Sequence, residues 1–108
     1  MKTSRLNIAM CSLFFTLLAV SAQTQPSAAT LTANPVFEKN CAKCHGKAAE
    51  GRHFGGPSLL SDRTAATSAD DLRNIINSGK GRMPKYAGKL TSEGIDTLVQ
   101  QIKAANKK

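Results

Sequence analysis

The chain has 108 residues, which is enough for one small domain, and it carries a formal net charge of +8. Aromatic residues make up only 5% of it and tryptophan is absent, so a core built from side chains alone is hard to complete at this size. Such a positive charge raises the question of nucleic-acid binding. The export signal described next argues against that function and favours an acidic protein partner or an anionic surface.

The first 22 residues have the composition of a secretory signal peptide. Lys2 and Arg5 give it a basic start, and residues 6–20 are almost all apolar. Small residues before and at Ala22 suit a signal peptidase, so we expect cleavage there and a periplasmic product without stable membrane insertion. The alternative is an uncleaved anchor, for which the apolar stretch is short.

Residues 23–33 are mostly Ser, Ala, Thr and Gln without a periodic apolar pattern. They predict a flexible leader ahead of a domain that spans residues 34–108. Asn34 followed by Pro35 is typical of a helix start, with asparagine as the N-cap and proline at the first helical position. We therefore expect a helix that runs through Phe37 to about Cys41.

Cys41 and Cys44 are followed directly by His45, which completes the Cys-x-x-Cys-His pattern of covalent haem c attachment. The two thiols suit the two vinyl groups on one edge of a haem, and the histidine then serves as an axial iron ligand. The alternatives are a chance match, a zinc half-site and a redox dithiol. Because Cys11 lies in the predicted signal, the exported chain keeps only this pair of cysteines and is not a disulfide scaffold.

Residues 46–58 hold four glycines and one proline, which predicts an irregular loop. We interpret His53 in this loop as a surface or propionate-side residue. Iron ligation is its alternative role, and a zinc site with the motif residues is disfavoured because His45 directly follows Cys44. Pro57 is the candidate whose carbonyl accepts the second ring N–H of His45 and fixes the ring plane. The alternative is an ordinary loop proline.

Two further helices are predicted, so the fold class is all-α. Ser68 opens the first of them and Gly79 ends it, and the second begins near Thr91. Their apolar residues recur at helical spacing and predict the buried faces: Leu72, Ile75 and Ile76 in the first, then Ile95, Leu98, Val99 and Ile102 in the second. Between them, residues 79–88 predict a second irregular loop.

This second loop contains Met83, the only methionine outside the predicted signal. Its glycines permit tight turns, and Pro84 biases Met83 toward an extended backbone. A stiff loop of this kind suits a thioether that must be held at a fixed distance from iron. The alternative is ordinary packing of a methionine in the core.

Together these motifs resemble those of small class I c-type cytochromes, particularly the bacterial and photosynthetic short forms, over residues 34–102. The segments that carry the resemblance are Cys41–Gly46 with Phe37 before them, Gly56–Leu59, Gly81–Tyr86 and residues 90–93. It implies a cytochrome c fold of three to four short helices around one haem attached to Cys41 and Cys44. It also implies axial ligation by His45 and Met83 and an orienting Pro57 carbonyl.

The resemblance adds Arg82 and Tyr86 to the residues expected at the cofactor. It further implies that the first and last helices cross at right angles. Two departures concern this crossing: Ala33 stands where the family usually has glycine, and no aromatic residue lies near Gln101.

An iron with both axial positions filled exchanges one electron with little movement. The predicted function is therefore a monomeric one-electron carrier and not an enzyme, and its partners are redox proteins with an acidic docking face. Basic residues in the two haem-side segments would steer such partners, unless they are merely solvated: Lys43, Lys47, Lys80, Arg82, Lys85 and Lys89. The alternatives are a haem subunit of a periplasmic dehydrogenase and, if Met83 does not bind iron, a haem sensor or peroxidase-like protein.

Overall fold

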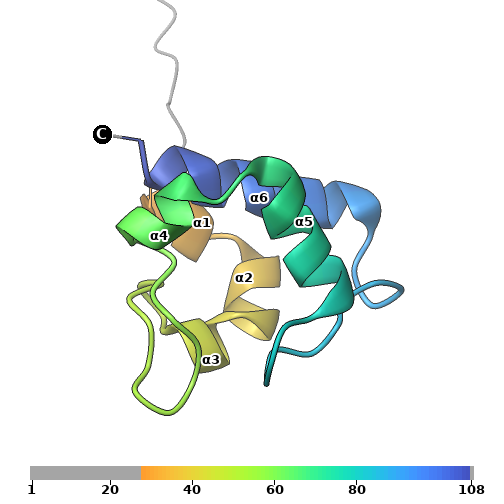
Figure 1. Ribbon diagram of the computed structural model, residues 1–108, viewed down its shortest axis with the longest axis horizontal. Helices are drawn as coiled ribbons and strands as arrows, with labels where there is room; N and C mark the ends of the chain where they lie inside the picture. Colours follow the sequence, from red (N-terminus) through yellow and green to blue (C-terminus); the bar gives the residue numbers. More distant parts are fainter. Residues whose placement is uncertain (1–27, 108) are drawn as a thin grey trace, which may run out of the picture.

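The computed structural model describes residues 28–107, so the predicted signal peptide lies outside the described part of the chain. Six helices follow one another: α1 Ala28–Thr32, α2 Pro35–Asn40, α3 Ala42–His45, α4 Asp62–Ala66, α5 Ala69–Ser78 and α6 Ser92–Ala105 (Figure 1). In these residues the only β-type pairings are two isolated bridges, Lys80 with Met83 and Ala87 with Leu90. The all-α prediction is confirmed.

Helix α6 organises the fold, because α1, α4 and α5 all pack against it. Figure 1 shows α6 running across the top of the molecule, with α2 and α3 below it and a long loop on either side of them. The predicted apolar face of α6 is buried: its four residues are at most 5% exposed. Of the three residues predicted for the buried face of α5, Leu72 and Ile76 are buried, whereas Ile75 is only half-buried.

The prediction of a flexible leader over residues 23–33 is wrong from Ala28 onward. Residues Ala28–Thr32 form α1, and Leu31 is completely buried in the core. Helix α1 is also the N-terminal helix that packs chiefly on α6, where we expected the helix after Asn34. The sequence does not reveal this helix, because one apolar residue makes no periodic pattern and the main packing partner of α1 is α6, which begins only at Ser92.

The predicted helix caps are confirmed. Asn34 accepts a hydrogen bond from the Val36 N–H, Ser68 accepts from Asp71, and Thr91 accepts from Gly94. The Asn34 side-chain amide also donates to Gln101 Oε1 at 2.8 Å, which joins the start of α2 to α6. Helix α4 is not predicted by the apolar pattern. It is capped by Ser61 and buries only the threonine Thr64.

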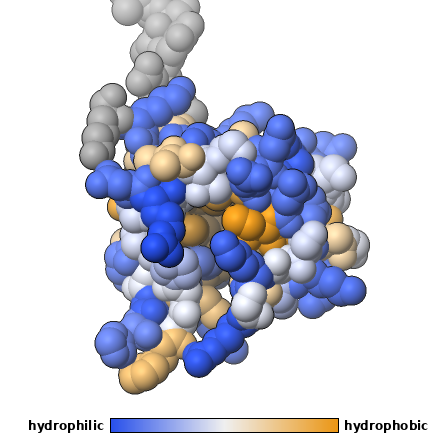
Figure 2. Space-filling view, in the orientation of Figure 1, coloured by the Kyte–Doolittle hydropathy of each residue, from blue (hydrophilic) through white to orange (hydrophobic). Residues whose placement is uncertain are grey.

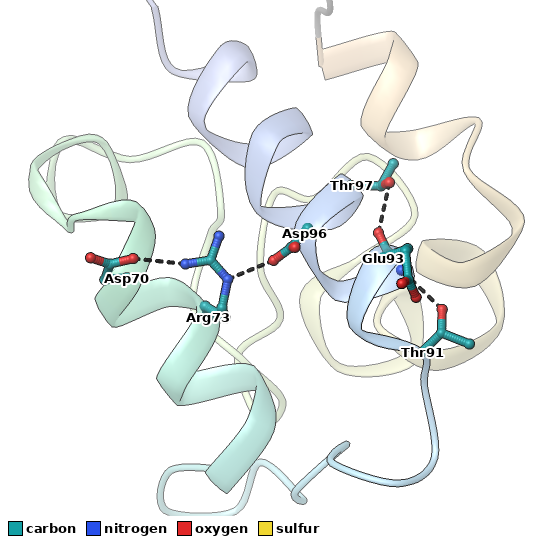
Figure 3. Close-up of polar contacts among 7 residues, drawn as sticks. Asp70, Arg73, Thr91, Glu93, Asp96 and Thr97 are labelled. Atoms are coloured by element: carbon teal, nitrogen blue, oxygen red, sulfur yellow. Dashed lines mark hydrogen bonds and ion pairs between the residues drawn. The ribbon is translucent and has the colours of Figure 1, made fainter.

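Polar contacts hold α4 and α5 against α6. Arg73 of α5 lies between Asp70 of its own helix and Asp96 of α6, and the hydrogen bond to Asp96 is the main cause that raises the Arg73 pKa (Figure 3). At the other end of α6, the Lys103 ammonium donates to the Ala65 and Thr67 carbonyls, both at 2.8 Å. These last contacts satisfy carbonyls at the end of the short helix α4.

Within residues 28–107, no helix combines the length and the apolar character needed to cross a bilayer.

Candidate haem-binding site

The site begins at the junction of α2 and α3, where Cys41 ends one helix and opens the next. The His45 N–H donates to the Cys41 carbonyl at 2.9 Å, so the motif is wound into one helical turn. Cys41 is half-buried and Cys44 is exposed. Burial, with a smaller contribution from Cys44, raises the pKa of the free Cys41 thiol to about 11, so this sulfur stays protonated at neutral pH until it is modified.

His45 is buried, and a carbonyl fixes its ring. Nδ1 lies 2.8 Å from the Pro57 oxygen. Because a carbonyl oxygen can only accept, Nδ1 must carry the proton, and the lone pair of the neutral ring is then on Nε2. The hydrogen bond proposed from the sequence is therefore present, and it leaves the ring nitrogen that a metal would need free of that proton.

The loop after α3 folds back onto the motif and closes over the ring. The Gly51 N–H donates to the His45 carbonyl at 2.6 Å, and the Gly56 N–H donates to the Cys44 carbonyl at 2.7 Å. A Cβ on Gly56 would lie 2.6 Å from the His45 ring, so only glycine fits against the imidazole. Ala49 adopts a left-handed φ of 60° while completely buried, which marks the tight turn at the start of this loop.

On the other side of the site, the loop between α5 and α6 presents Met83. Met83 and Lys80 exchange backbone hydrogen bonds at 3.0 and 3.2 Å, and the Met83 side chain is half-buried against the core. Gly79 makes the turn from α5 with φ +75°, and a Cβ there would lie 2.5 Å from the Met83 carbonyl oxygen. The sequence prediction of a stiff turn around this methionine agrees with this geometry.

Tyr86 connects this second loop to the cysteine side. Its hydroxyl donates to the Asn40 carbonyl at 2.8 Å, directly before Cys41, and its N–H donates to the Ile76 carbonyl of α5 at 3.0 Å. Burial raises the pKa of the Tyr86 hydroxyl, and nearby Cys41 and Cys44 add to the shift, so the hydroxyl remains a donor. Sequence reasoning missed this contact, since no local pattern links positions 40 and 86.

Apolar side chains from both sides of the site are covered only in part. Figure 2 shows apolar surface in a hollow at the centre of this face. The partly buried apolar residues that pack on the core come from α2 and from both loops: Val36, Cys41, Leu59, Met83, Tyr86 and Leu90. Two free thiols, a histidine with an available Nε2, a thioether and this apolar surface fit a covalently attached haem.

The remaining predicted residues lie outside this constellation. Arg82 is exposed at the tip of the methionine loop. His53 is also exposed, with its ring edge-on to Phe54 at a centroid distance of 4.7 Å. Among residues 28–107, no three His, Cys, Asp or Glu side chains are grouped to hold a metal ion, so His53 does not complete the zinc arrangement considered above.

Comparison with known proteins decides the family. The family model described as cytochrome c oxidase, cbb3-type, subunit III matches residues 28–102. The chain belongs to this family of c-type cytochromes. The match begins at the first residue of α1, which agrees with the corrected domain start.

This cytochrome also resembles a named relative. It is 32% identical to cytochrome c6 of Leptolyngbya boryana over 70 residues, which are 62% of this chain and 81% of that protein. The chain is therefore a small monohaem class I c-type cytochrome of c6-like type, and haem c bound covalently through Cys41 and Cys44 is its cofactor.

Solved structures show the same fold. The KustC0563 c-type cytochrome matches with a TM-score of 0.59 and 24% identity, over 67% of this chain and 94% of that one. The c-type cytochrome NirC matches with a TM-score of 0.56 and 25% identity, over 69% and 86%. Cytochrome c6C from Synechococcus sp. PCC 7002 matches with a TM-score of 0.54 and 28% identity, over 72% and 94%.

Proposed function

We propose that this cytochrome is a periplasmic one-electron carrier in which His45 and Met83 are the axial ligands of the haem iron. The hydrogen bond between His45 Nδ1 and the Pro57 carbonyl is the observation that carries the proposal, because it directs the Nε2 lone pair away from the loop that holds the ring. When bound, haem c supplies the one-electron chemistry, and the protein's residues determine how tightly the iron is enclosed.

Met83 supports a carrier for two reasons. Its loop is closed by backbone hydrogen bonds to Lys80 and anchored to α5 and α2 through Tyr86, so its sulfur has few positions to occupy. A thioether in place of a second imidazole raises the reduction potential. A filled sixth position also excludes small ligands, and this separates a carrier from a sensor or a peroxidase.

Charge on the two haem-side segments supports an acidic redox partner. Every basic residue of these segments is exposed: Lys43, Lys47, Arg52, Lys80, Arg82, Lys85 and Lys89. The single acidic residue there, Glu50, accepts a hydrogen bond from the Ala48 N–H. The other acidic residues lie on helices: Glu38 in α2, Asp62 in α4, Asp70 and Asp71 in α5, and Glu93 and Asp96 in α6. Separated charge of this kind orients an acidic partner during a brief encounter.

The predicted signal over residues 1–22 supports export to the periplasm, where haem is attached and the carrier works as a monomer. A second candidate is a haem subunit of a larger redox complex, since the family description names an oxidase subunit, and a periplasmic dehydrogenase subunit was the alternative from the sequence. A carrier should purify alone from the periplasmic fraction with its N-terminus at Gln23. Stable copurification with an enzyme would favour the subunit.

The axial ligands can be tested by the visible spectrum of the purified ferric and ferrous protein. We expect a haem c spectrum with the weak red charge-transfer band of methionine-ligated ferric iron, and no carbon monoxide binding to the reduced form. Met83→Ala should abolish the band and admit carbon monoxide, whereas His53→Ala, the matched control, should change neither. A wild-type protein that lacks the band, or that binds carbon monoxide, would support the sensor or peroxidase function instead.

A further inference from the structure

The tip of the loop between α3 and α4 carries an aromatic residue that the haem site does not use. Phe54 is 86% exposed, and its ring lies edge-on to that of His53 at a centroid distance of 4.7 Å. Figure 2 shows apolar surface at the lower tip of this loop between hydrophilic groups. A single exposed apolar side chain is ordinary on a protein surface. Here, its attachment to the cysteine motif makes it unusual.

Backbone hydrogen bonds fix the position of Phe54 relative to Cys44. The tip is a closed turn, in which the Arg52 N–H donates to the Gly56 carbonyl at 3.0 Å and the Gly55 N–H donates to the Arg52 carbonyl at 3.1 Å. The next N–H, that of Gly56, donates to the Cys44 carbonyl. Phe54 is thus presented by a short, rigid tip that is hydrogen-bonded to the exposed attachment cysteine.

A surface hollow of about 430 Å³ lies between this tip and Cys44. Its lining is Lys43, Cys44, Arg52, His53, Phe54 and Gly55. None of His45, Met83 and Tyr86 lines it, so it lies outside the space between the axial residues. Cys44, one of the two residues that would hold the haem, lines the hollow, so a partner seated there would lie beside the attachment site.

We propose that Phe54 is the apolar contact through which a redox partner docks beside Cys44, and that the partner presents an apolar patch bordered by carboxylates. This inference rests on the proposed carrier function and specifies its docking site. Lys43 and Arg52 supply the basic border. Glu50 is the acidic residue nearest to Phe54 in the sequence, and its carboxylate accepts a hydrogen bond from the Ala48 N–H. Transient redox interfaces are small, so one rigid aromatic anchor carries a large share of the contact.

Small oxidants test where electrons leave the protein. The reduced protein passes one electron to tris(phenanthroline)cobalt(III), an aromatic cation, or to hexacyanoferrate(III), an anion. The metal of each oxidant is thereby reduced from the +3 to the +2 state. At low ionic strength, Phe54→Lys should speed the reaction with hexacyanoferrate and slow that with the cobalt complex, each about fourfold, because one added charge acts at the exit point. Phe54→Ala should slow only the cobalt complex, about threefold, through loss of aromatic contact.

Leu60→Lys is the matched control, since Leu60 is the other exposed large apolar residue among residues 28–107 and does not line the hollow. It adds the same charge and should change both rates much less. Equal effects of the two lysine substitutions, or an unchanged cobalt rate in Phe54→Ala, would overturn the docking site. The visible spectrum and the carbon monoxide test of these variants report separately on the axial ligands. Failure of the proposed carrier function can therefore be distinguished from failure of the docking site.

Discussion

The two loops that enclose the haem site are held in different ways. In the loop of residues 46–58, the hydrogen bonds are made to the Cys-x-x-Cys-His motif itself. The Gly51 N–H donates to the His45 carbonyl, the Gly56 N–H donates to the Cys44 carbonyl, and the Pro57 carbonyl accepts from the His45 ring. In the loop of residues 79–91, the ligand candidate Met83 bonds only within its own turn. The anchors are Tyr86 and Ala87, whose N–H groups donate to the Ile76 and Asn77 carbonyls of α5, together with the Tyr86 hydroxyl that donates to Asn40.

This difference predicts how the site comes apart. The histidine cannot move without breaking contacts made directly to its ring and backbone, whereas Met83 is held less directly, through its own turn and the anchors that follow it. Local stability follows such contacts, so the segment with fewer of them opens first. We therefore expect the methionine side to open before the histidine side, and the following substitutions test this from the largest expected effect to the smallest.

Gly56→Ala should have the largest effect. Its Cβ would be placed 2.6 Å from the His45 ring, and neither the ring nor the hydrogen-bonded backbone can retreat easily. Overpacking of this kind costs roughly 2–3 kcal/mol of unfolding free energy. Chemical denaturation of the holoprotein would measure it. A cost under about 1 kcal/mol would show that the histidine loop is held no more firmly than the methionine loop, and the proposed difference between the two loops would be wrong.

Gly79→Ala should disturb the methionine side with a smaller loss of stability. The substitution strains a backbone with φ +75° and directs a methyl at the Met83 carbonyl, 2.5 Å away. We expect a cost of about 2 kcal/mol from the strained backbone, because the less directly held Met83 turn can shift away from the methyl, and this shift should weaken the methionine charge-transfer band. Gly81→Ala is the control in the same loop, because its φ is +58° but no atom lies within 4 Å of the new Cβ. A band that weakens equally in both variants would refute a specific role of the Gly79 turn.

Tyr86→Phe removes the hydroxyl that ties the methionine loop to Asn40. One lost hydrogen bond predicts a decrease of about 1 kcal/mol in unfolding free energy. We further expect the charge-transfer band to disappear at a lower denaturant concentration than the loss of helical circular dichroism, with the gap wider than in the wild type. Coincident transitions in both proteins would mean that the two loops open together.

The same variant has a signature in pH. The pKa of Tyr86 is raised in the folded state, chiefly by burial, so above the unfolded value near 10 the folded protein keeps a proton that the unfolded chain has released. Stability from this group is complete below pH 10 and is lost as pH rises through the folded pKa. Between the unfolded and the folded pKa of Tyr86, the unfolding free energy of the wild type should fall more steeply with pH than that of Tyr86→Phe. Parallel plots of unfolding free energy against pH would contradict a raised pKa of Tyr86 in the folded state.

Features that depend on residues a few positions apart could be predicted from the sequence. The caps at Asn34, Ser68 and Thr91, the apolar face of α6 and the Cys-x-x-Cys-His turn are all of this kind, because a hydrogen bond or a helical period links neighbours in the chain. The Pro57 contact was also predictable, since an axial histidine usually donates its second ring N–H to a carbonyl and Pro57 lies in the loop that follows.

Features that depend on distant partners could not be predicted. Helix α1 exists because Leu31 is buried by a helix at the other end of the domain, and five residues carry no pattern of their own. The Tyr86 anchor spans 46 positions. Ala49 is a third case, because its left-handed backbone occurs in a residue that usually avoids it, and only the closed turn around it explains the choice.

Ala49→Gly should have the smallest effect, because two opposing contributions nearly cancel. Relief of the left-handed backbone at φ 60° stabilises the folded state by about 1 kcal/mol. Loss of a fully buried methyl costs about 0.8 kcal/mol, and the added freedom of glycine in the unfolded chain costs a further 0.5 kcal/mol or so. The net change in unfolding free energy should stay within about 0.5 kcal/mol of zero. A loss above about 1.5 kcal/mol would show that the methyl itself packs the histidine loop, and the contrast between the loops would then rest on side-chain packing as well as on backbone hydrogen bonds.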